Sequence, residues 1–387
     1  MNKIEFGDNR ETMKKWAEEG VKVQMCVTSP PYYGLRDYGT GEWTGGDPTC
    51  DHIEHVNSHG GERADRDQSS QVFQYTKVCS KCGALREDKQ LGQEDTPEEF
   101  IENMVDVFRH VREILADDGV IWVNMGDSYY NYRPGSGAYA KQTIANSRQD
   151  LPMSSAKRSK KMEGLKNKDL IGIPWMLAFA LRADGWFLRQ DIIWHKPNPM
   201  PESVRDRCTK THEYIFLLSK NQNYYFNHEA IKEPSVYYGK DKRSDQGNIR
   251  YEGKRSQDTS GKNGQDSFVT INEKRNKRSV WTVNTKPYKG AHFATYPMEL
   301  IEPCILAGSR PGDIVLDPFM GSGTTAQTAL KHGRQYLGCE LNESYHDLQQ
   351  ERISKEQIGA NPDLFEVETP DTPVSPNLFD EDLEDDA

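Results

Sequence analysis

Residues 317–325, with the sequence DPFMGSGTT, join two segments that have different patterns of apolar residues. Residues 313–317 (DIVLD) have the apolar, β-branched pattern of a buried strand, and residues 324–332 have the pattern of a helix. Residues 335–340 (QYLGCE) then predict a second strand, which ends in Glu340. This order of strand, glycine-rich turn, helix and strand is typical of α/β folds that bind nucleotides.

The glycine-rich turn predicts a pocket for an adenosine-type cofactor. Gly321 and Gly323 permit a tight turn and the close approach of a ligand to the backbone, and the first N–H groups of the following helix are free. An acid at the position of Glu340 can accept hydrogen bonds from both ribose hydroxyls. The turn lacks the Gly-Lys-Ser/Thr of a phosphate-binding loop and the full Gly-x-Gly-x-x-Gly fingerprint. A lone Gly-x-Gly also fits a structural turn, but the order of the surrounding elements favours the cofactor.

A second motif, Ser29-Pro30-Pro31-Tyr32, directly follows a predicted strand at residues 21–29. Two prolines cannot extend a central strand, so the chain is stiff and turns at this point. The turn lies at the carboxyl end of the strand, where ligands bind in open α/β sheets. Its hydroxyl and carbonyl oxygens can accept hydrogen bonds from an exocyclic amino group, and Tyr32 can stack on a planar base. Taken alone, the motif also fits a rigid turn with a packed tyrosine.

Together, the two motifs resemble those of the DNA amino-methyltransferases that use S-adenosylmethionine (SAM), in the circularly permuted order of the β group. That family carries Asp/Asn/Ser-Pro-Pro-Tyr/Phe and Phe-x-Gly-x-Gly, which Ser29–Tyr32 and Phe319–Gly323 match here. Further segments match in order along the chain: Gly7–Asn9, Val123–Ser128, Gly185–Pro199, Thr211–Tyr214 and His292–Pro297. The resemblance implies an α/β, Rossmann-like SAM-dependent methyltransferase fold with a mixed, mostly parallel seven-stranded sheet. It also implies that the target base is flipped out of the DNA.

The resemblance further implies the roles of the site residues. The catalytic turn consists of Ser29, Pro30, Pro31 and Tyr32. In the family, the hydroxyl and the first proline carbonyl accept hydrogen bonds from the target amino group, and the tyrosine stacks on the base. The cofactor-binding residues are expected to be Asp8, Phe293, Thr295, Asp317, Phe319, Gly321, Ser322, Gly323, Thr324 and Glu340. No Pro-Cys motif follows a strand, so a covalent mechanism at C5 of cytosine is disfavoured.

The first residue of the catalytic turn indicates the target base. Within the family, Ser-Pro-Pro-Tyr leans to N4 of cytosine and Asp-Pro-Pro-Tyr to N6 of adenine. Ser29 therefore favours a site-specific DNA methyltransferase that modifies N4 of cytosine, and N6 of adenine is the alternative. A non-catalytic, zinc-dependent DNA-binding protein is a more distant alternative, which the two intact motifs oppose. An RNA or protein methyltransferase is the third class that we considered.

Four candidate metal ligands lie in a polar stretch of the chain. Cys50 and His52 are followed by Cys79 and Cys82, a Cys-x-x-Cys pair with a glycine directly after it. This set predicts a structural, tetrahedral zinc site, with His55 as the alternative to His52. A small insertion with few apolar residues would gain its folding energy from the metal. Two unrelated cysteine pairs, or a redox pair at Cys79 and Cys82, are the alternatives.

The motifs and the composition divide the chain of 387 residues into regions of different character. The expected regions are a catalytic domain at 1–40, 96–228 and 291–355, a zinc-binding insertion at 41–95, a mobile basic loop at 129–168, a target-recognition region at 229–290 and a disordered acidic tail at 356–387.

The distribution of charge favours a nucleic-acid partner. The net charge is −11, but residues 360–387 contain ten acidic and no basic residues, so the rest of the chain is close to neutral. Within that rest, residues 141–168 have a net charge of +6 and residues 236–290 a net charge of +7. Basic segments on a near-neutral body favour a polyanionic partner. The second segment also lies where the family has its target-recognition region, so we expect double-stranded DNA.

The remaining features concern the setting of the protein. No run approaches the roughly 18 apolar residues that a membrane span needs, and the first residues contain no secretory signal. The seven cysteines are an odd number, which disfavours a disulfide framework. We expect a cytoplasmic enzyme of bacterial or phage origin, with or without a cognate restriction endonuclease. The sequence does not indicate the oligomeric state.

Overall fold

The computed structural model describes residues 1–34, 40–52, 78–79, 81–131, 162, 164–235, 273–285 and 296–359. Some of the predictions concern residues outside this set. They are the cofactor residues Phe293 and Thr295, most of the basic loop, most of the target-recognition region and the acidic tail from residue 360 onward.

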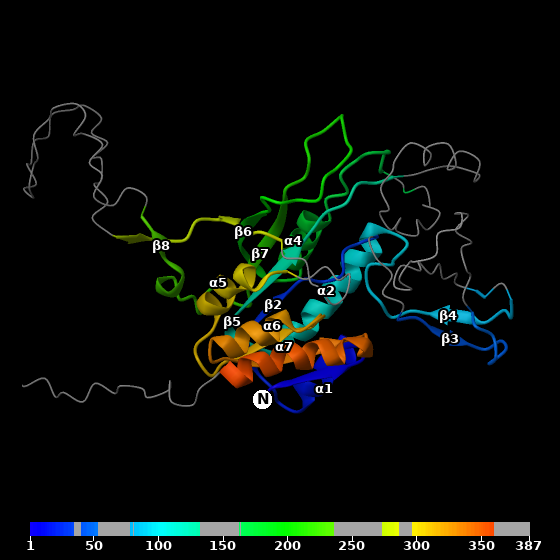
Figure 1. Ribbon diagram of the computed structural model, residues 1–387, viewed down its shortest axis with the longest axis horizontal. Helices are drawn as coiled ribbons and strands as arrows, with labels where there is room; N and C mark the ends of the chain where they lie inside the picture. The colour runs from blue at the N-terminus through cyan, green and yellow to red at the C-terminus, as the bar shows by residue number, and fades with distance from the viewer. Residues whose placement is uncertain are drawn as a thin grey trace, which may run out of the picture.

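An eight-stranded mixed sheet forms the centre of the described structure (Figure 1). The strands in order across the sheet are β1 (Lys3–Phe6), β12 (Gln335–Glu340), β11 (Ile314–Asp317), β2 (Val23–Thr28), β5 (Leu115–Met125), β7 (His212–Ser219), β6 (Phe187–His195) and β10 (Val280–Thr282). Neighbours from β1 to β5 are parallel, β7 is antiparallel to both of its neighbours, and β10 is parallel to β6. The predicted α/β methyltransferase-like fold is confirmed, with one strand more than the seven that the resemblance implies.

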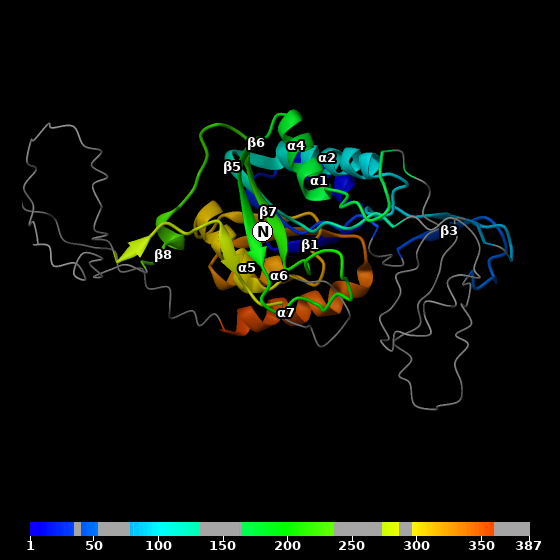
Figure 2. The ribbon, with the colours of Figure 1, turned by 90° about the horizontal axis from the view of Figure 1, so that it is seen from above.

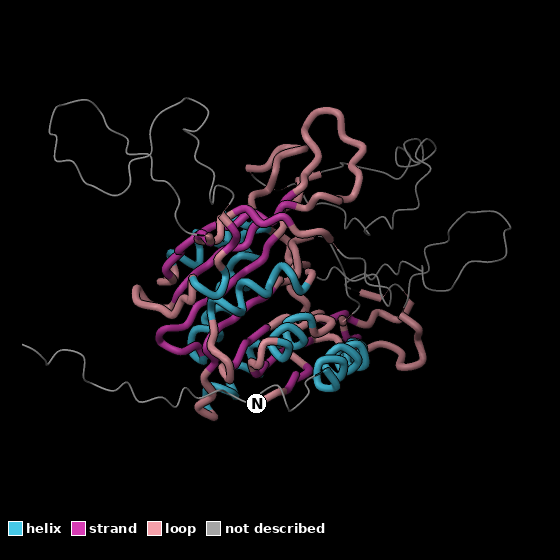
Figure 3. The backbone as a smooth tube through the Cα atoms, turned by 60° about the vertical axis from the view of Figure 1, so that its left-hand side comes forward, coloured by secondary structure: helices cyan, strands magenta, loops and turns pink. Residues whose placement is uncertain are grey.

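Helices cover both faces of this sheet (Figures 2 and 3). One layer consists of α1 (Asn9–Glu18), α2 (Pro97–Ile114) and α4 (Ile173–Ala183). The other layer consists of α5 (Met298–Gly308), α6 (Thr324–Lys331) and α7 (His346–Gly359). Each layer encloses one cluster of buried apolar side chains against the sheet, so the core has two halves. No described helix is long and apolar enough to cross a membrane.

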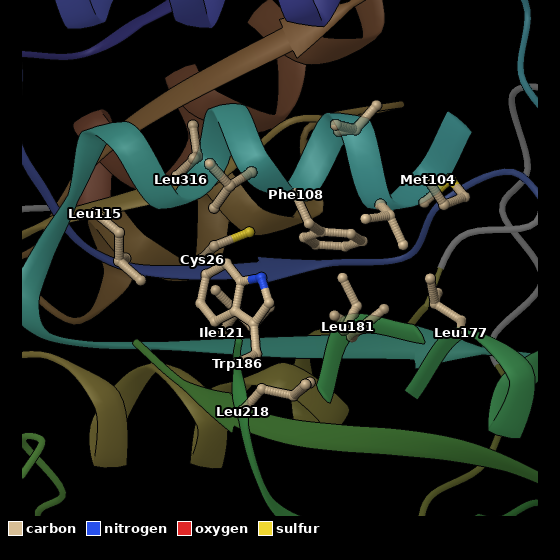
Figure 4. Packing of buried hydrophobic residues seen from close by; sticks show 14 of the residues in the cluster. Cys26, Met104, Phe108, Leu115, Ile121, Leu177, Leu181, Trp186, Leu218 and Leu316 are labelled. Carbon is tan, nitrogen blue, oxygen red and sulfur yellow. The ribbon is translucent and has the colours of Figure 1, made fainter. Parts of the chain in front are cut away.

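Helix α2 shows how the sequence produces this packing. Its N-cap hydroxyl, on Thr96, accepts a hydrogen bond from the Glu99 N–H at 3.1 Å, and the Glu99 carboxylate accepts one from the Asp95 N–H at 3.1 Å. These bonds fix the first turn of the helix in an arrangement close to a capping box, in which the Glu99 carboxylate would accept from the N–H of the N-cap residue itself. The apolar residues of the helix then recur every three or four positions and form one buried face. On that face Phe108 lies in the same cluster as Leu181 of α4 (Figure 4).

The strands predicted around the two motifs and the helix after the glycine-rich turn are confirmed, with ends that differ by at most two residues. β5 follows α2 without a break, because it begins at Leu115. Leu115 pairs with Val23 of β2, and its carbonyl accepts a hydrogen bond from Lys220 Nζ at 2.8 Å. These contacts keep the Asp-Asp-Gly of residues 117–119 within the strand.

Some elements lie where the sequence patterns predicted none. β1 and α1 precede the first predicted strand, and α7 continues to Gly359, past residue 356, where the tail was predicted to begin. β10 lies within the stretch assigned to target recognition. It joins the sheet because Trp281 is buried against Trp122, with ring centroids 6.3 Å apart. The Trp281 indole N–H also donates to the Arg278 carbonyl at 2.7 Å.

Two pairs of short strands lie at opposite ends of the molecule (Figure 1). The predicted insertion contains β3 (Glu42–Thr44) and β4 (Leu85–Glu87), which are antiparallel. We call the described residues 40–52, 78–79 and 81–92 the β3–β4 module. At the other end, β8 (Glu233–Pro234) pairs with β9 (Lys274–Arg275).

Candidate active site and metal cluster

The strands β1, β12, β11 and β2 are parallel neighbours, so their carboxyl ends meet at one edge of the sheet. Four predicted site residues lie at these ends. Asp8 follows β1, Glu340 ends β12, Asp317 ends β11, and Ser29 follows β2. The fold therefore brings together the two motifs, which lie far apart in the sequence.

A cavity opens at this edge of the sheet. The predicted residues in its lining are Asp8, Ser29, Pro31, Phe319, Gly321, Ser322 and Glu340. The hydroxyl of Ser322 is buried and has no hydrogen-bond partner within the described structure, so it is available to a ligand. Two carboxylates beside the ring of Phe319 suit a ligand that has both a flat apolar part and hydroxyl donors. These features fit the adenosine part of SAM.

Glu340 is the most unusual carboxyl group of the cavity. Its Oε2 accepts a hydrogen bond from the Gly321 N–H at 2.7 Å, and its Oε1 accepts one from the Asn342 N–H at 2.9 Å. Burial raises its pKa to about 7, although both N–H groups act in the opposite direction. Each carboxylate oxygen can accept more than one hydrogen bond. The group can therefore also accept the two ribose hydroxyls for which the sequence predicted it.

Asp8 lines the cavity at the N-terminus of α1, next to the end of β12, since the Gly7 N–H donates to the Glu340 carbonyl at 2.8 Å. Its Oδ1 accepts the Arg10 backbone N–H at 2.9 Å, and its Oδ2 pairs with Arg10 Nη2 at 2.8 Å. Burial acts to raise the pKa of Asp8, but the side-chain and backbone hydrogen bonds from Arg10 hold it below its usual value. The carboxylate is thus ionised and fixed in place at neutral pH. Its contact with the cofactor adenine stays a prediction.

Asp317 holds the site together from behind the cavity. It is 1% exposed and does not belong to the cavity lining. Its Oδ1 accepts the Thr28 hydroxyl at 2.6 Å, and its Oδ2 accepts the hydroxyls of Thr325 at 2.5 Å and Tyr296 at 3.0 Å. Burial raises the pKa of Asp317, and the hydroxyls of Thr28 and Thr325 oppose that shift. The geometry ties β11 to the end of β2, whereas the predicted cofactor contact of Asp317 stays untested.

Gly323 and Thr324 also lie outside the cavity lining of the described structure. Gly323 has a φ of +86°, a left-handed conformation that favours glycine. A Cβ at this position would lie 3.4 Å from Gln349 Cα, so glycine also permits α7 to pack closely. The Thr324 hydroxyl accepts a hydrogen bond from the guanidinium of Arg352. In this structure the two residues shape the turn and the start of α6.

The catalytic turn is oriented by a buried asparagine. Ser29 Oγ donates to Asn124 Oδ1 at 3.2 Å. The amide of Asn124 is held in turn by its Nδ2, which donates to the Tyr214 carbonyl at 3.1 Å. Because the Ser29 hydroxyl has a single proton, its lone pairs remain available as acceptors. Ser29 and Pro31 line the cavity, whereas Pro30 and Tyr32 do not.

Tyr32 is held at both its hydroxyl and its ring. Its hydroxyl donates to Glu213 Oε2 at 2.7 Å, and Glu213 Oε1 forms an ion pair with Lys196 Nζ. The ring lies against the backbone after β5, where a Cβ at Gly126 would be 2.4 Å from Tyr32 Cε2. Glycine is therefore required there for the ring to take this position.

Sequence patterns missed several of these residues. Asn124 and Glu213 were noted only as parts of matching strand ends, and their hydrogen bonds to the catalytic turn were not predicted. The segment 89–91, which lines the cavity, was assigned to the zinc-binding insertion, and Thr40, which also lines it, was placed in the catalytic domain without a role. A polar residue in an otherwise apolar strand, as in the VNM of residues 123–125, is the signal that points to Asn124.

The four predicted metal ligands converge in the β3–β4 module. The ligand atoms of Cys50, His52, Cys79 and Cys82 all lie within 4.8 Å of one another. Cys50 Sγ is 3.8 Å from Cys79 Sγ, and Cys82 Sγ is 3.3 Å from His52 Nδ1. In a tetrahedral zinc site two thiolates are about 3.8 Å apart and a thiolate and an imidazole nitrogen about 3.5 Å. The residues therefore fit a zinc ion.

Local groups favour the thiolate form of two of the three cysteines. At Cys50 the backbone N–H of His52 acts to lower the pKa, but burial and the hydrogen bonds with Cys82 and Cys79 raise it overall. The His52 side chain is the main cause that lowers the pKa of Cys79. The backbone N–H of Asp47 is the main cause that lowers the pKa of Cys82. Gly46, with a φ of +72°, lies so close that a Cβ there would be 2.7 Å from Cys82 Sγ. The turn before Cys50 is thus shaped around the cluster.

Comparisons with known proteins show the family of the chain. The family model described as DNA methylase, which covers N6 and N4 methyltransferases, matches residues 23–351. Type II methyltransferase M.SmaI of Serratia marcescens is 41% identical over 351 residues, which are 91% of this chain and 90% of the relative. Type II methyltransferase M.Cfr9I of Citrobacter freundii is 40% identical over 334 residues, which are 86% and 82% of the two chains.

A solved structure shares the fold at low sequence identity. The PvuII DNA methyltransferase, described as cytosine-N4-specific, has a TM-score of 0.50 and 14% identity, covering 92% of this chain and 91% of its own. At that identity the likeness concerns the fold alone. The motifs, the cavity and the family match together show that the chain belongs to the N6/N4 DNA methylase family and is a SAM-dependent DNA methyltransferase related to the type II enzymes.

Proposed function

We propose that the protein methylates N4 of cytosine within a specific DNA sequence. The observation that carries this proposal is the orientation of the Ser29 hydroxyl in the wall of the cofactor cavity. Its proton is engaged by Asn124, so the oxygen offers lone pairs to an amino group. Serine at this position leans to cytosine in the family that the sequence resembles. The same arrangement with an aspartate would offer a charged acceptor instead.

The chemistry requires the amino nitrogen of the base to become a better nucleophile. SAM supplies, when bound, a methyl group on a positively charged sulfur. The lone pair of the amino nitrogen is normally drawn into the ring. Hydrogen bonds from its two N–H groups to Ser29 Oγ and the Pro30 carbonyl localise that lone pair on nitrogen. No covalent bond between the chain and the base is needed.

Tyr32 supplies the surface on which the flipped base is held. Its ring is fixed in advance by Glu213 and by the close approach to Gly126. A fixed ring loses little conformational entropy when a base stacks on it. Stacking and edge contacts must offset the cost of extruding the base, which is about a few kcal/mol.

Mass spectrometry of nucleosides from plasmid DNA treated with the enzyme and labelled SAM tests the target base. We expect N4-methylcytosine, and a Ser29→Ala variant that is about tenfold slower because one hydrogen bond to the amino group is lost. Ser354→Ala, on α7, serves as the matched control and should keep the wild-type rate. N6-methyladenine as the labelled product would overturn the cytosine assignment and leave the family and mechanism in place.

We further propose that Cys50, His52, Cys79 and Cys82 hold one structural zinc ion. The convergence of their ligand atoms supports this site. Metal analysis of the purified protein should give one zinc per chain, and Cys82→Ser should reduce it strongly. Cys208→Ser is the control, because Cys208 is exposed and outside the cluster. Full zinc content in the Cys82→Ser variant would remove Cys82 from the ligand set.

The remaining proposals concern the partners. We assign target recognition to residues 229–290, on the basis of their position between the two motifs and the basic charge of residues 236–290. A cognate restriction endonuclease is the expected partner in function, although not necessarily in complex. Mapping the methylated positions in a genome that carries the gene should show one sequence motif, and unmodified DNA with that motif should be cut by extracts of the same cells. Methylation scattered over unrelated sequences would contradict site specificity.

A further inference from the structure

The β3–β4 module forms part of the cofactor cavity. Its strand β4 leads through Asp88 into Lys89, Gln90 and Leu91, which line the cavity together with the glycine-rich turn. Thr40, at the other end of the module, lines it as well. The metal cluster and the cofactor site therefore share one short piece of chain.

A continuous series of contacts joins the metal cluster to this wall. The ring of His52 stacks on Trp43 of β3, with centroids 4.9 Å apart and an angle of 18° between the planes. Trp43 is paired with Arg86 of β4 in the two-stranded sheet. The Arg86 side chain lies so close to Gly41 that a Cβ there would be 2.2 Å from its Nε. The position of β4 is thus tied to that of a metal ligand.

Asp88 transmits this position to the cavity wall. Its Oδ2 pairs with Arg86 Nη2 at 2.9 Å, and the two side chains are only 15% and 9% exposed. Its Oδ1 accepts the Thr40 hydroxyl at 2.9 Å and the Gln90 N–H at 3.0 Å. One carboxylate therefore fixes both segments of the module that line the cavity. Buried hydrogen bonds to a charged group are strong enough to hold such a geometry.

The same segment also touches the catalytic turn. The Gly92 carbonyl accepts a hydrogen bond from the Gly34 N–H at 2.9 Å. Gly92 has a φ of +92°, and a Cβ on it would lie 3.0 Å from the Tyr32 carbonyl oxygen. Displacement of the module would thus disturb the chain on both sides of the methyl-transfer site.

We propose that binding of zinc and binding of SAM are thermodynamically coupled through the segment 88–91, with Asp88 as the positioning residue. The proposal rests on the zinc and SAM sites proposed above and adds a relation between them. Zinc orders the module, and the ordered module completes the cofactor cavity. By linkage, SAM must then raise the affinity for zinc by the same factor, which we expect to lie at roughly 5- to 150-fold.

The test is a closed thermodynamic cycle with the full-length protein and no DNA. Calorimetry gives the Kd of SAM for the zinc-loaded and the chelator-stripped protein. Competition with a zinc chelator gives the Kd of zinc in the presence and absence of saturating SAM. We expect both ratios to exceed fivefold and to agree with each other. A chain that binds no zinc or no SAM would overturn the proposed site together with the coupling, whereas two measurable but independent affinities would overturn the coupling alone.

Variants of the connecting carboxylate sharpen the test. Asp88→Ala should retain one zinc and bind SAM with an affinity that no longer depends on zinc. Glu87→Ala is the matched control, since Glu87 is the exposed last residue of β4, directly before Asp88, and it should keep the wild-type ratio. Thr40→Val removes a single hydroxyl and serves if Asp88→Ala loses zinc. An unchanged ratio in a zinc-containing Asp88→Ala variant would exclude this route.

Discussion

The central sheet and the β3–β4 module both contribute to the wall of one cavity, but different interactions stabilise them. The sheet lies between two clusters of apolar side chains, most of which are almost completely buried. The described part of the module contributes few buried apolar side chains, among them Ala84 and Leu91. Its four predicted metal ligands lie within 4.8 Å of one another instead. The sheet wall is therefore set by burial, whereas the proposed zinc ion would hold the module wall.

Removal of zinc should give the largest difference in local stability between the module and the sheet. Structural zinc sites contribute apparent free energies of about 10–16 kcal/mol to small domains, far more than the module can gain from burial. Chelation should therefore abolish protection of the Cys79 and Ala84 amides in hydrogen exchange. The amides of β5 and β11 should keep their protection in the same sample. Equal loss of protection in both regions would show that the module and the sheet form one cooperative unit.

A substitution that leaves a void in the apolar core should destabilise the sheet and leave the zinc content unchanged. Phe108 is completely buried between α2, α4 and the sheet. Phe108→Ala should lower the free energy of unfolding by about 3–5 kcal/mol, as measured by denaturant titration. Zinc content per folded chain should stay at the wild-type level. A loss of zinc from the folded variant would contradict the independence of the two regions.

The pH dependence of SAM binding tests the part of the cavity wall that the sheet forms. Burial raises the pKa of Glu340 to about 7 from the usual 4.5, so the ionised form is disfavoured in the free folded protein. Folding without ligand therefore becomes less favourable as the pH rises between these values. Ribose hydroxyls donate to the ionised carboxylate, so SAM affinity should rise as the pH rises, about tenfold for each unit below the pKa. Calorimetry from pH 6 to pH 8 measures this slope.

Glu340→Gln provides the control for that slope. The amide cannot ionise, so its SAM affinity should be lower at pH 8 and nearly constant with pH. A wild-type slope that persists in this variant would mean that another group carries the pH dependence.

The smallest effect is expected at the hydroxyl of Tyr32. Glu213→Gln keeps the shape of the side chain and removes the negative charge of the group that accepts the hydrogen bond from the Tyr32 hydroxyl. A charge-assisted hydrogen bond is worth about 1.5 kcal/mol or more, so kcat should fall about tenfold. The Kd of SAM should not change, because Glu213 is outside the cofactor cavity. Glu18→Gln, on the exposed end of α1, is the control. A changed Kd of SAM with an unchanged kcat in the Glu213→Gln variant would contradict the positioning role of Glu213.

Short motifs predicted the part of the site that lies within single strand–turn–helix units. Gly321, Glu340 and Ser29 were found because each belongs to a local sequence signal. These signals are the glycines of a turn, an acid at the end of a strand and a double proline. The contact of Tyr32 with Glu213 spans 181 residues and depends on the antiparallel placement of β7, which no local pattern records.

The residues of the module that line the cavity could not be predicted from the sequence for a different reason. Lys89 and Gln90 follow a three-residue strand in a polar stretch without periodicity, so nothing in that stretch distinguishes a cavity wall from a loop. β10 was missed because its three residues are placed by the burial of Trp281 and by backbone pairing with β6, far away in the sequence. Tertiary contacts, and not propensity, decide such short elements.

Two parts of the chain outside the described residues are each flanked by residues that are bonded to one another. The Ser235 N–H, before residues 236–272, donates to the Glu273 carbonyl, after them, at 2.8 Å. The Lys168 N–H likewise donates to the Tyr130 carbonyl at 2.8 Å, and these two residues flank residues 132–161. Because each pair of flanking residues is held together, a change in the number of residues between them costs little closure entropy. Insertions at these two places should therefore leave the sheet and its cavity intact.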